Sequence, residues 1–576
     1  MTHRDPITLE VINNRLGEIV STMERLLFHS GYSTILRESY YGSAGITNTQ
    51  GESVLSSGMP THLPPYYYTV QAVLRRYQPS EMREGDSFLI NDPYKAGNLH
   101  SPDVAIVTPV FYQGALIAFS TSIAHKPDIG GIVPGSSGAM AREIFHDGML
   151  MPGVRFWTRD GVVSDIEAIV ASNCRTPELT IGDLRAQVGC THVGAEKLKQ
   201  LCDEYGVTTV LDTFSQLQEG SERRIRAVLR EWPDAEVEEQ EYLEPDGLDN
   251  EGLIRAHVRV VKKGDAITFD FSKSSPQIKG PVNIRPQAVE SATMLALVGF
   301  LDPSIPLNHG ARRAMEFINP EGTLCNPRFP APVNNYTGIM TIYHGIILRA
   351  LEAFVPARAF GSPGMGTGAL SLGYKGLKTG KAQVQYEVMV TSLGATSAND
   401  GTFLSSAMGH SSPSTPIEIL ETEFPVMVET FEVAPDTGGA GLHRGGMGFR
   451  RVYRIEEDET SLTVRFTPFK TRGWGALGGK TPGLGTVTLR SNDGSESPLP
   501  MMVTRDLQDG DRVDIVKVGG GGYGNPFERA PEKVRDDLLD GYVTIKGARN
   551  DYGVVIDPAT KAIDRAATAK LRAEGG

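Results

Sequence analysis

Length, composition and charge restrict the kind of protein before any motif is considered. The chain has 576 residues, too many for one hydrophobic core, so we expect several lobes. Lys and Arg total 56 against 69 for Asp and Glu, and the net charge of −13 argues against nucleic acid or anionic membrane as main partner. No long apolar run, leader pattern or CxxC pair occurs, which predicts a cytoplasmic protein without a membrane span or disulfide framework.

The first ninety residues predict helices beside short strands. Residues 7–30 have apolar side chains at helical spacing after an Asp-Pro start. A hairpin that turns at Gln50-Gly51 follows, and Pro64-Pro65 lead into a second helix. Residues 85–90 then read as a strand that ends at the next segment.

The segment 91–131, NDPYKAGNLHSPDVAIVTPVFYQGALIAFSTSIAHKPDIGG, predicts a hairpin that carries a cluster of polar side chains. Two apolar runs flank a turn signal at Gln113-Gly114. In such a hairpin the numbers of cross-strand partners sum to about 227, which places Asp103 opposite Ala124. Asp103 then lies one residue from His125, with His100 in the loop before it. Two imidazoles and a carboxylate on one rim suit a divalent metal; the alternative is ordinary turn and strand-end residues.

The remaining elements follow in order along the chain. Helices are predicted at 184–205, 210–232, 289–301 and 339–354. An acidic connection at 233–252 is predicted to separate two lobes, and paired strands are predicted at 253–261 and 266–271. Short strands separated by glycine turns are predicted at 461–466, 486–489, 500–503 and 512–516, before a short helix at 531–541.

These elements predict an α+β fold with several lobes, in which mixed sheets and hairpins pack against helices and a β-rich module lies near the C-terminus. We expect an N-terminal α+β lobe with the hairpin at 1–235, a middle α+β lobe at 236–420, the β-rich module at 421–530, and a helix and tail at 531–576.

Motifs for nucleotide binding and serine hydrolysis are absent. Gly478-Gly479-Lys480-Thr481 resembles the end of a P-loop, but Trp474 stands where the first glycine is needed and Pro482 follows. No GxSxG elbow occurs. The glycine run 519–522 predicts a turn that packs closely against a neighbour. We therefore expect no ATP or NAD site in this chain.

Ordered segments across nearly the whole chain resemble the hydantoinase B family. The segments are NDPYKAGNLHSPDVAIVTPVF, AHKPDIGG, GPVN, STPIEILETEFP, DTGGAGLHRGGMGFRR and GGGGYGNP. The family includes the second large subunit of ATP-dependent hydantoinases, the matching half of 5-oxoprolinase, and subunits of acetone and acetophenone carboxylases.

The resemblance implies a metal site and a partner. By motif position, His100, Asp103 and His125 would be the ligands of a divalent ion such as zinc, manganese or iron, with Asp92 and Asp128 behind them. It also implies a hetero-oligomer with a hydantoinase A-type subunit that uses ATP and Mg to phosphorylate a small-molecule substrate. Carboxylases of this kind would contain an additional small subunit.

One departure from the family pattern bears on the reaction. Hydrolytic members have an ERxDFS-like segment, and here Tyr41 stands where its Asp is expected. A phenol has an ordinary pKa of about 10 and is a poor base. We therefore predict a subunit of a ketone carboxylase that uses bicarbonate, where desolvation protects an enolate. Tyr40, Tyr41 and the run 66–68 are predicted to line a pocket for an aromatic ketone.

Two alternatives remain open. The first is an ATP-dependent hydantoinase, 5-oxoprolinase or lactam amidohydrolase, with Glu38 or Asp128 as the base in place of the missing carboxylate. The second is a non-catalytic structural subunit of such a complex.

Overall fold

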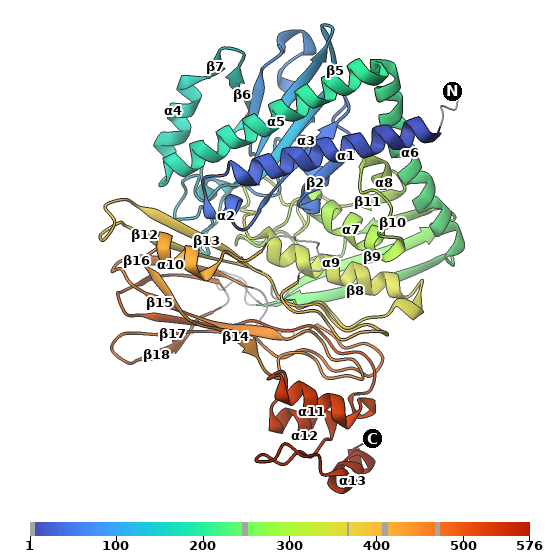
Figure 1. The fold of residues 1–576 in the computed structure, drawn as a ribbon, viewed down its shortest axis with the longest axis vertical. Helices are drawn as coiled ribbons and strands as arrows, with labels where there is room; N and C mark the ends of the chain where they lie inside the picture. Colours follow the sequence, from blue (N-terminus) through green and yellow to red (C-terminus); the bar gives the residue numbers. More distant parts are fainter. Residues whose placement is uncertain are drawn as a thin grey trace.

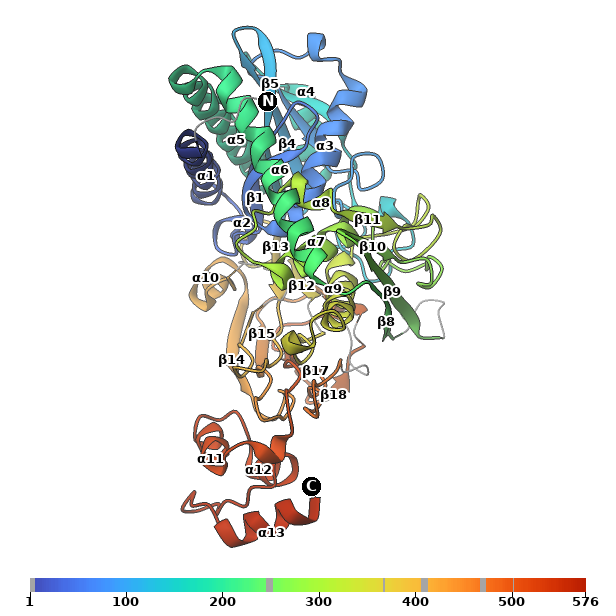
Figure 2. The same cartoon turned by 90° about the vertical axis from the view of Figure 1, so that its right-hand side faces the viewer.

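The computed structural model describes residues 6–244, 252–365, 368–405, 413–466, 473–500 and 502–575. Within these ranges the chain has the predicted α+β fold, with separate sheets and packed helices (Figure 1). The N-terminal lobe and the C-terminal helices lie at opposite ends of the long axis, with the middle of the chain between them (Figure 2).

The N-terminal lobe contains a seven-stranded antiparallel sheet with the order β2-β1-β5-β4-β3-β6-β7. Its strands are β1 Gly42–Thr47, β2 Ser53–Gly58, β3 Ser87–Ile90, β4 Asp103–Tyr112, β5 Ala115–His125, β6 Pro152–Thr158 and β7 Gly161–Val162. The predicted hairpins β1–β2 and β4–β5 are both confirmed. The β4–β5 hairpin lies in the centre of the sheet, so helices can cover both of its faces.

Helices pack on both faces of this sheet (Figure 2). They are α1 Pro6–His29, α2 Thr34–Arg37, α3 Leu63–Arg76, α4 Ser164–Asn173, α5 Pro177–Tyr205 and α6 Val207–Glu231. Ala105 and Val107 of β4 belong to the core beneath α3, whereas Val104 and Ile106 belong to the core beneath α5. Because alternate residues point to opposite faces, burial of both faces explains why β4 is continuously apolar.

The register of the β4–β5 hairpin differs by one residue from the prediction. Next to the turn, Tyr112 pairs with Ala115 as expected, but a β-bulge follows between Val110 and Phe111. Beyond the bulge each partner moves by one position, so Asp103 pairs with His125 and not with Ala124. Directly opposite residues share one face of a sheet, while a neighbour in sequence points to the other face. The observed register therefore places Asp103 and His125 on the same face.

The middle of the chain forms a four-stranded sheet with the order β11-β10-β9-β8, covered by helices. The elements are β8 Ala235–Leu243, β9 Ile254–Lys263, β10 Ala266–Asp270, β11 Met315–Ile318, α7 Pro286–Leu301, α8 His309–Arg312 and α9 Tyr336–Glu352. The prediction of an acidic connection is wrong over residues 235–243, because these residues form strand β8. Its outward carboxylates pair with basic side chains, as Glu236 does with Arg259 at 2.6 Å. Residues 245–251 of that segment lie outside the described residues.

Two further sheets share one hydrophobic core near the C-terminus, as the predicted β-rich module requires. The first has the order β13-β12-β16-β19, with β12 Gly368–Tyr374, β13 Gln383–Met389, β16 Thr460–Arg465 and β19 Met502–Leu507. The second has the order β14-β15-β20-β17-β18, with β14 Val426–Ala434, β15 Gly448–Ile455, β20 Arg512–Val516, β17 Thr486–Arg490 and β18 Glu496–Pro498. The associated helices are α10 Ile417–Glu423, α11 Pro531–Leu539, α12 Ile545–Tyr552 and α13 Arg565–Gly575.

The predicted domain boundaries stay predictions. Strands β12 and β13 lie before the boundary expected at residue 420, yet β12 pairs with β16, which lies after it. This pairing places the face of a C-terminal sheet beside the N-terminal lobe, where Gly135 packs against Ser371 of β12.

The glycine run 519–522 lies in an irregular segment after β20 and forms no turn, so the predicted turn is wrong. Its backbone bonds to several neighbouring segments, with Gly520 N–H donating to the Gly446 carbonyl and Gly521 N–H donating to that of Ser362. The predicted close packing is present: an ideal Cβ at Gly520 would lie 2.2 Å from the Leu393 carbonyl oxygen. Glycine is required here because neighbouring backbones approach closer than any side chain allows.

Replacing Gly520 with alanine is expected to destabilise the chain by about 2–3 kcal/mol, because the added methyl meets backbone that cannot move alone. The matched control is Gly189→Ala in α5, where a Cβ meets nothing within 4 Å. That change should stabilise the chain by roughly 0.5–1 kcal/mol through helix propensity. Urea unfolding measures both variants, and equal midpoints would contradict the packing argument.

Candidate metal centre

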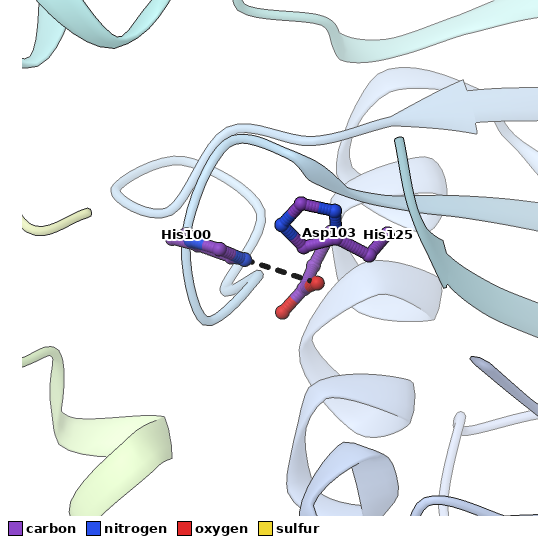
Figure 3. Close-up of side chains that lie close together, drawn as sticks. All are labelled: His100, Asp103 and His125. Carbon is purple, nitrogen blue, oxygen red and sulfur yellow. Dashed lines mark ion pairs between the residues drawn. The ribbon is translucent and has the colours of Figure 1, made fainter. Parts of the chain in front are cut away.

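Three potential ligands meet at the open end of the β4–β5 hairpin (Figure 3). The bulge places Asp103 directly opposite His125, and the loop before β4 supplies His100. One ligand atom from each residue lies within 4.8 Å of the others. His100 Nε2 is 3.0 Å from Asp103 Oδ1, and all three side chains are buried.

The atoms that face one another in this trio lack ordinary partners. Both ring nitrogens of His125 have no hydrogen bond in the described part of the chain, and His100 Nε2 and Asp103 Oδ1 have none beyond the 3.0 Å ion pair that they form with each other. His100 Nδ1 lies 2.7 Å from Asn334 Oδ1, which also accepts from Ser137 Oγ. The Asn334 amide oxygen accepts a hydrogen bond from Nδ1 of His100, so the lone pair of His100 Nε2 points toward the other two residues of the trio. Buried polar atoms that converge without partners are what a bound cation would satisfy.

The surroundings hold Asp103 and His125 in the protonation states that a metal requires. Burial alone would raise the pKa of Asp103, but the neighbouring imidazoles hold it well below its usual range. Burial holds the pKa of His125 well below its ordinary value. The carboxylate is therefore ionised and the imidazole neutral near pH 7, and both can donate a lone pair.

The donor set fits a divalent transition metal. Two imidazole nitrogens and one carboxylate oxygen are the ligands that zinc, manganese and iron accept in catalytic sites, where a further position stays open. A further imidazole lies nearby, since His62 Nε2 is 3.9 Å from Asp103 Oδ2 and has no hydrogen-bond partner among the described residues. His62 Nδ1 bonds to the Ser43 hydroxyl at 2.8 Å, which orients the ring.

Tyrosine side chains from three parts of the chain enclose the trio. The Tyr41 hydroxyl is 3.0 Å from that of Tyr336, which in turn donates to Asp103 Oδ2 at 3.3 Å. The ring of Tyr41 lies edge-on to His125 at 5.0 Å, and that of Tyr386 lies over His125 at 4.3 Å. All three tyrosines are buried, so the centre is lined by aromatic rings and shielded from water.

Of the tyrosines predicted to line an aromatic pocket, Tyr41 lies against the trio, and the pocket itself stays a prediction. Tyr40 is 41% exposed and stacks on Phe28. The run 66–68 lies on α3, where Tyr68 donates to Glu290, away from the trio. Tyr40 and Tyr68 lie away from the trio because neighbours in sequence on a strand end or a helix point in different directions.

The candidate bases Glu38 and Asp128 do not join the trio. Glu38 accepts from the Arg37 side chain at 2.7 Å and is partly exposed. The buried Asp128 carboxylate accepts from two backbone N–H groups of its own loop and from the backbone and guanidinium of Arg175. Asp92 likewise accepts from the backbone N–H groups two and three residues after it. Asp128 and Asp92 therefore hold the loops that position the ligands.

Several residues beside the trio were not predicted from the sequence. They are His62, Asn334, Tyr336, Tyr386 and Arg465. Only His62 has a signal of its own, as a histidine before the predicted α3 helix. The others lie more than two hundred residues from the hairpin and show no local pattern.

The free energy of unfolding of the metal-free chain is expected to fall as pH drops from 6.5 to about 4. Burial lowers the pKa of His62 to about 4, so the ring is neutral when folded but takes up a proton near pH 6.5 when unfolded. The unfolded state therefore binds more protons in this window, and His62 alone costs up to about 3 kcal/mol at its lower end.

Urea unfolding between pH 4 and pH 7 measures this dependence. His62→Gln should flatten the slope, whereas the exposed control His29→Gln should leave it unchanged. An unchanged slope in His62→Gln would show that His62 is already protonated in the folded chain.

Comparison with known proteins relates this chain to a family. A family model described as hydantoinase B/oxoprolinase matches residues 5–526. The caprolactamase beta chain of Pseudomonas jessenii is 32% identical, with 99% of this chain and 99% of that protein covered. The acetophenone carboxylase delta chain of Aromatoleum aromaticum is 28% identical, with 89% and 80% covered.

The fold also matches a solved structure. The crystal structure of ATP-dependent caprolactamase from Pseudomonas jessenii has a TM-score of 0.91 and 30% identity, with 99% of this chain and 100% of that chain covered. In the part of the chain that the structure describes, no helix combines the length and apolar character needed to cross a membrane.

Proposed function

The chain belongs to the hydantoinase B/oxoprolinase family, and from this premise we propose that it is the metal-holding subunit of an ATP-dependent enzyme. A hydantoinase A-type partner binds ATP and Mg and phosphorylates the reactant. The lack of a nucleotide motif in this sequence supports that division of labour. His100, Asp103 and His125 hold the metal in this chain, supported by their converging, unpartnered ligand atoms.

The reaction we propose is carboxylation of a ketone, in which an enolate carbon forms a bond to the carboxyl carbon of phosphorylated bicarbonate, while the bond from that carbon to the phosphate oxygen breaks and inorganic phosphate leaves. The observation that carries this proposal is Tyr41, whose ring faces the trio where hydrolytic relatives are expected to have a carboxylate. Burial, together with the charge of Asp103, raises the pKa of Tyr41 well above its ordinary value. The phenol therefore keeps its proton and does not act as a base toward water.

The chain's own side chains suit a reaction that must exclude water. A divalent ion in the site would act as a Lewis acid toward an oxygen of the reactant. Tyr41, Tyr336 and Tyr386 close the site, and an enolate lasts longer where water cannot protonate it. Glu38 and Asp128 are engaged by arginine side chains, so neither is placed to replace the missing base.

ATP consumption by the chain co-purified with its partner tests this proposal. Acetone or acetophenone with bicarbonate should raise ATP hydrolysis at least ~10-fold above the rate without ketone, with incorporation of labelled bicarbonate into a carboxylate product. Turnover with hydantoins or lactams but not with ketones would refute carboxylation.

A second candidate function is ATP-dependent opening of a cyclic amide. The comparisons favour it, because the caprolactamase chain matches this chain end to end, whereas the acetophenone carboxylase chain is covered over 80%. The same assay separates the two functions, since ring opening consumes ATP with 5-oxoproline, hydantoin or caprolactam and needs no bicarbonate.

A further inference from the structure

A buried arginine lies directly behind the aromatic wall of the candidate metal centre. Arg465 ends strand β16, and its side chain is 2% exposed. One guanidinium nitrogen, Nη2, donates to the Tyr386 hydroxyl at 3.0 Å, and the ring of Tyr386 lies over His125. Arg465 is therefore linked to the ligand trio through a single side chain.

The positive charge of Arg465 is not offset by an acidic partner. No carboxylate of the described residues lies within 4.0 Å of its guanidinium, and Nε has no hydrogen-bond partner there. The buried arginines Arg451 and Arg529 differ, because each pairs with a carboxylate at 2.9 Å or less. An unpaired buried cation costs several kcal/mol, so its retention at a functional centre points to a ligand that supplies the negative charge.

Asp147 is the acidic side chain that the structure couples to Arg465, and it does not neutralise it. Burial raises the pKa of Asp147 well above its ordinary value, and the charge of Arg465 opposes that rise only in part. Neither carboxylate oxygen of Asp147 has a hydrogen-bond partner among the described residues, so Asp147 forms no ion pair with the guanidinium there. A divalent ion beside Asp103 would leave one net positive charge at the centre, and Arg465 would add a second.

We propose that Arg465 is an anion-binding residue of this centre and that it binds the phosphoryl group of an activated reactant. A guanidinium presents its N–H groups as a planar fork that matches two oxygens of a phosphoryl or carboxylate group. Two positive charges in a buried site favour a dianion, which a phosphoryl group supplies and a carboxylate does not. The assignment of a phosphoryl group rests on the proposed function, in which the partner phosphorylates the reactant. The assignment of an anion site at Arg465 does not rest on the proposed function.

Calorimetric titration of inorganic phosphate into the purified chain tests the site without turnover. Phosphate should bind the wild type, more tightly with Mn²⁺ than without it. Arg465→Met should weaken phosphate binding at least ~10-fold, and Arg465→Lys should weaken it less because it keeps the charge but loses the fork. The control is Arg505→Gln, an exposed arginine on β19 of the same sheet, which should leave binding unchanged.

Formate replaces phosphate in a second titration to distinguish the two oxyanions. Tighter binding of phosphate assigns a phosphoryl ligand, whereas tighter binding of formate would overturn that assignment in favour of a carboxylate at the same arginine. Equal phosphate affinity in wild type and Arg465→Met, or no binding by the wild type, would overturn the anion site altogether.

Thermal unfolding separates ligand binding from a structural role. Because Arg465 has no ion pair among the described residues, Arg465→Met should unfold at or above the wild-type temperature. A lower unfolding temperature with unchanged phosphate affinity would show that Arg465 only supports the fold. If phosphate binding depends on Arg465 but ketone-dependent ATP hydrolysis is absent, the anion site stands and the carboxylase proposal fails.

Discussion

Replacing His125 with alanine is expected to remove the metal and lower turnover of the assembled enzyme at least ~1000-fold, more than the roughly 10- to 100-fold loss typical of residues behind a metal's ligands. Both ring nitrogens of His125 are buried without a hydrogen bond, so the side chain has no other polar role in the described structure. His100→Ala should have the same effect, because its Nε2 is also directed at the trio.

Elemental analysis of the purified complex measures this loss directly. Wild-type protein should contain about one divalent ion per chain, and each variant less than about a tenth of that. His29→Ala, at the exposed end of α1, is the matched control and should retain both metal and activity. A wild-type complex without divalent metal, together with full activity in His100→Ala and His125→Ala, would instead identify a non-catalytic structural subunit.

The proximity of His100, Asp103 and His125 was predictable from the sequence because all three lie in one hairpin and the loop directly before it. A turn signal between two apolar runs brings Asp103 near His125 whatever the exact register. The register itself was not predicted, because the turn signal fixes only the pairs beside it, and the bulge between Val110 and Phe111 shifts the pairs beyond. Pro109, directly before Val110, is a local signal of such a bulge. The shift by one position decides whether the carboxylate and the imidazole share a face of the sheet.

The rest of the centre comes from distant parts of the chain that only the tertiary fold brings together. Tyr386 lies on β13 and Arg465 on β16, in a sheet whose face meets the N-terminal lobe. Asn334 precedes α9 and reaches back to His100. Nothing in their local sequence distinguishes these residues from ordinary strand and loop positions. The acidic strand β8 was missed for a related reason, since its charge suggested a solvated connection while its pairing with β9 was not visible.

Replacing Tyr41 with aspartate is expected to lower ketone-dependent turnover at least ~1000-fold, equivalent to about 4 kcal/mol of transition-state stabilisation. The phenol is buried, bonded to Tyr336 and edge-on to His125. A carboxylate there would add a potential fourth ligand to the trio and a second negative charge beside Asp103. It would occupy the position that the reactant needs and would admit water. The variant should retain its metal, so the loss of turnover would not result from a loss of bound metal.

Tyr41→Phe is the matched control for the role of the residue at this position. It keeps the ring that shields His125 and removes only the hydroxyl that contacts Tyr336, so turnover should fall less than ~10-fold. If the enzyme opens cyclic amides, the order reverses: Tyr41→Asp would restore a base and raise hydrolysis of hydantoin or caprolactam above that of the wild type. Assays of both variants with ketones and with cyclic amides therefore separate two cases. Either carboxylation requires the Tyr41 phenol, or the enzyme is a hydrolase that works without a carboxylate at position 41.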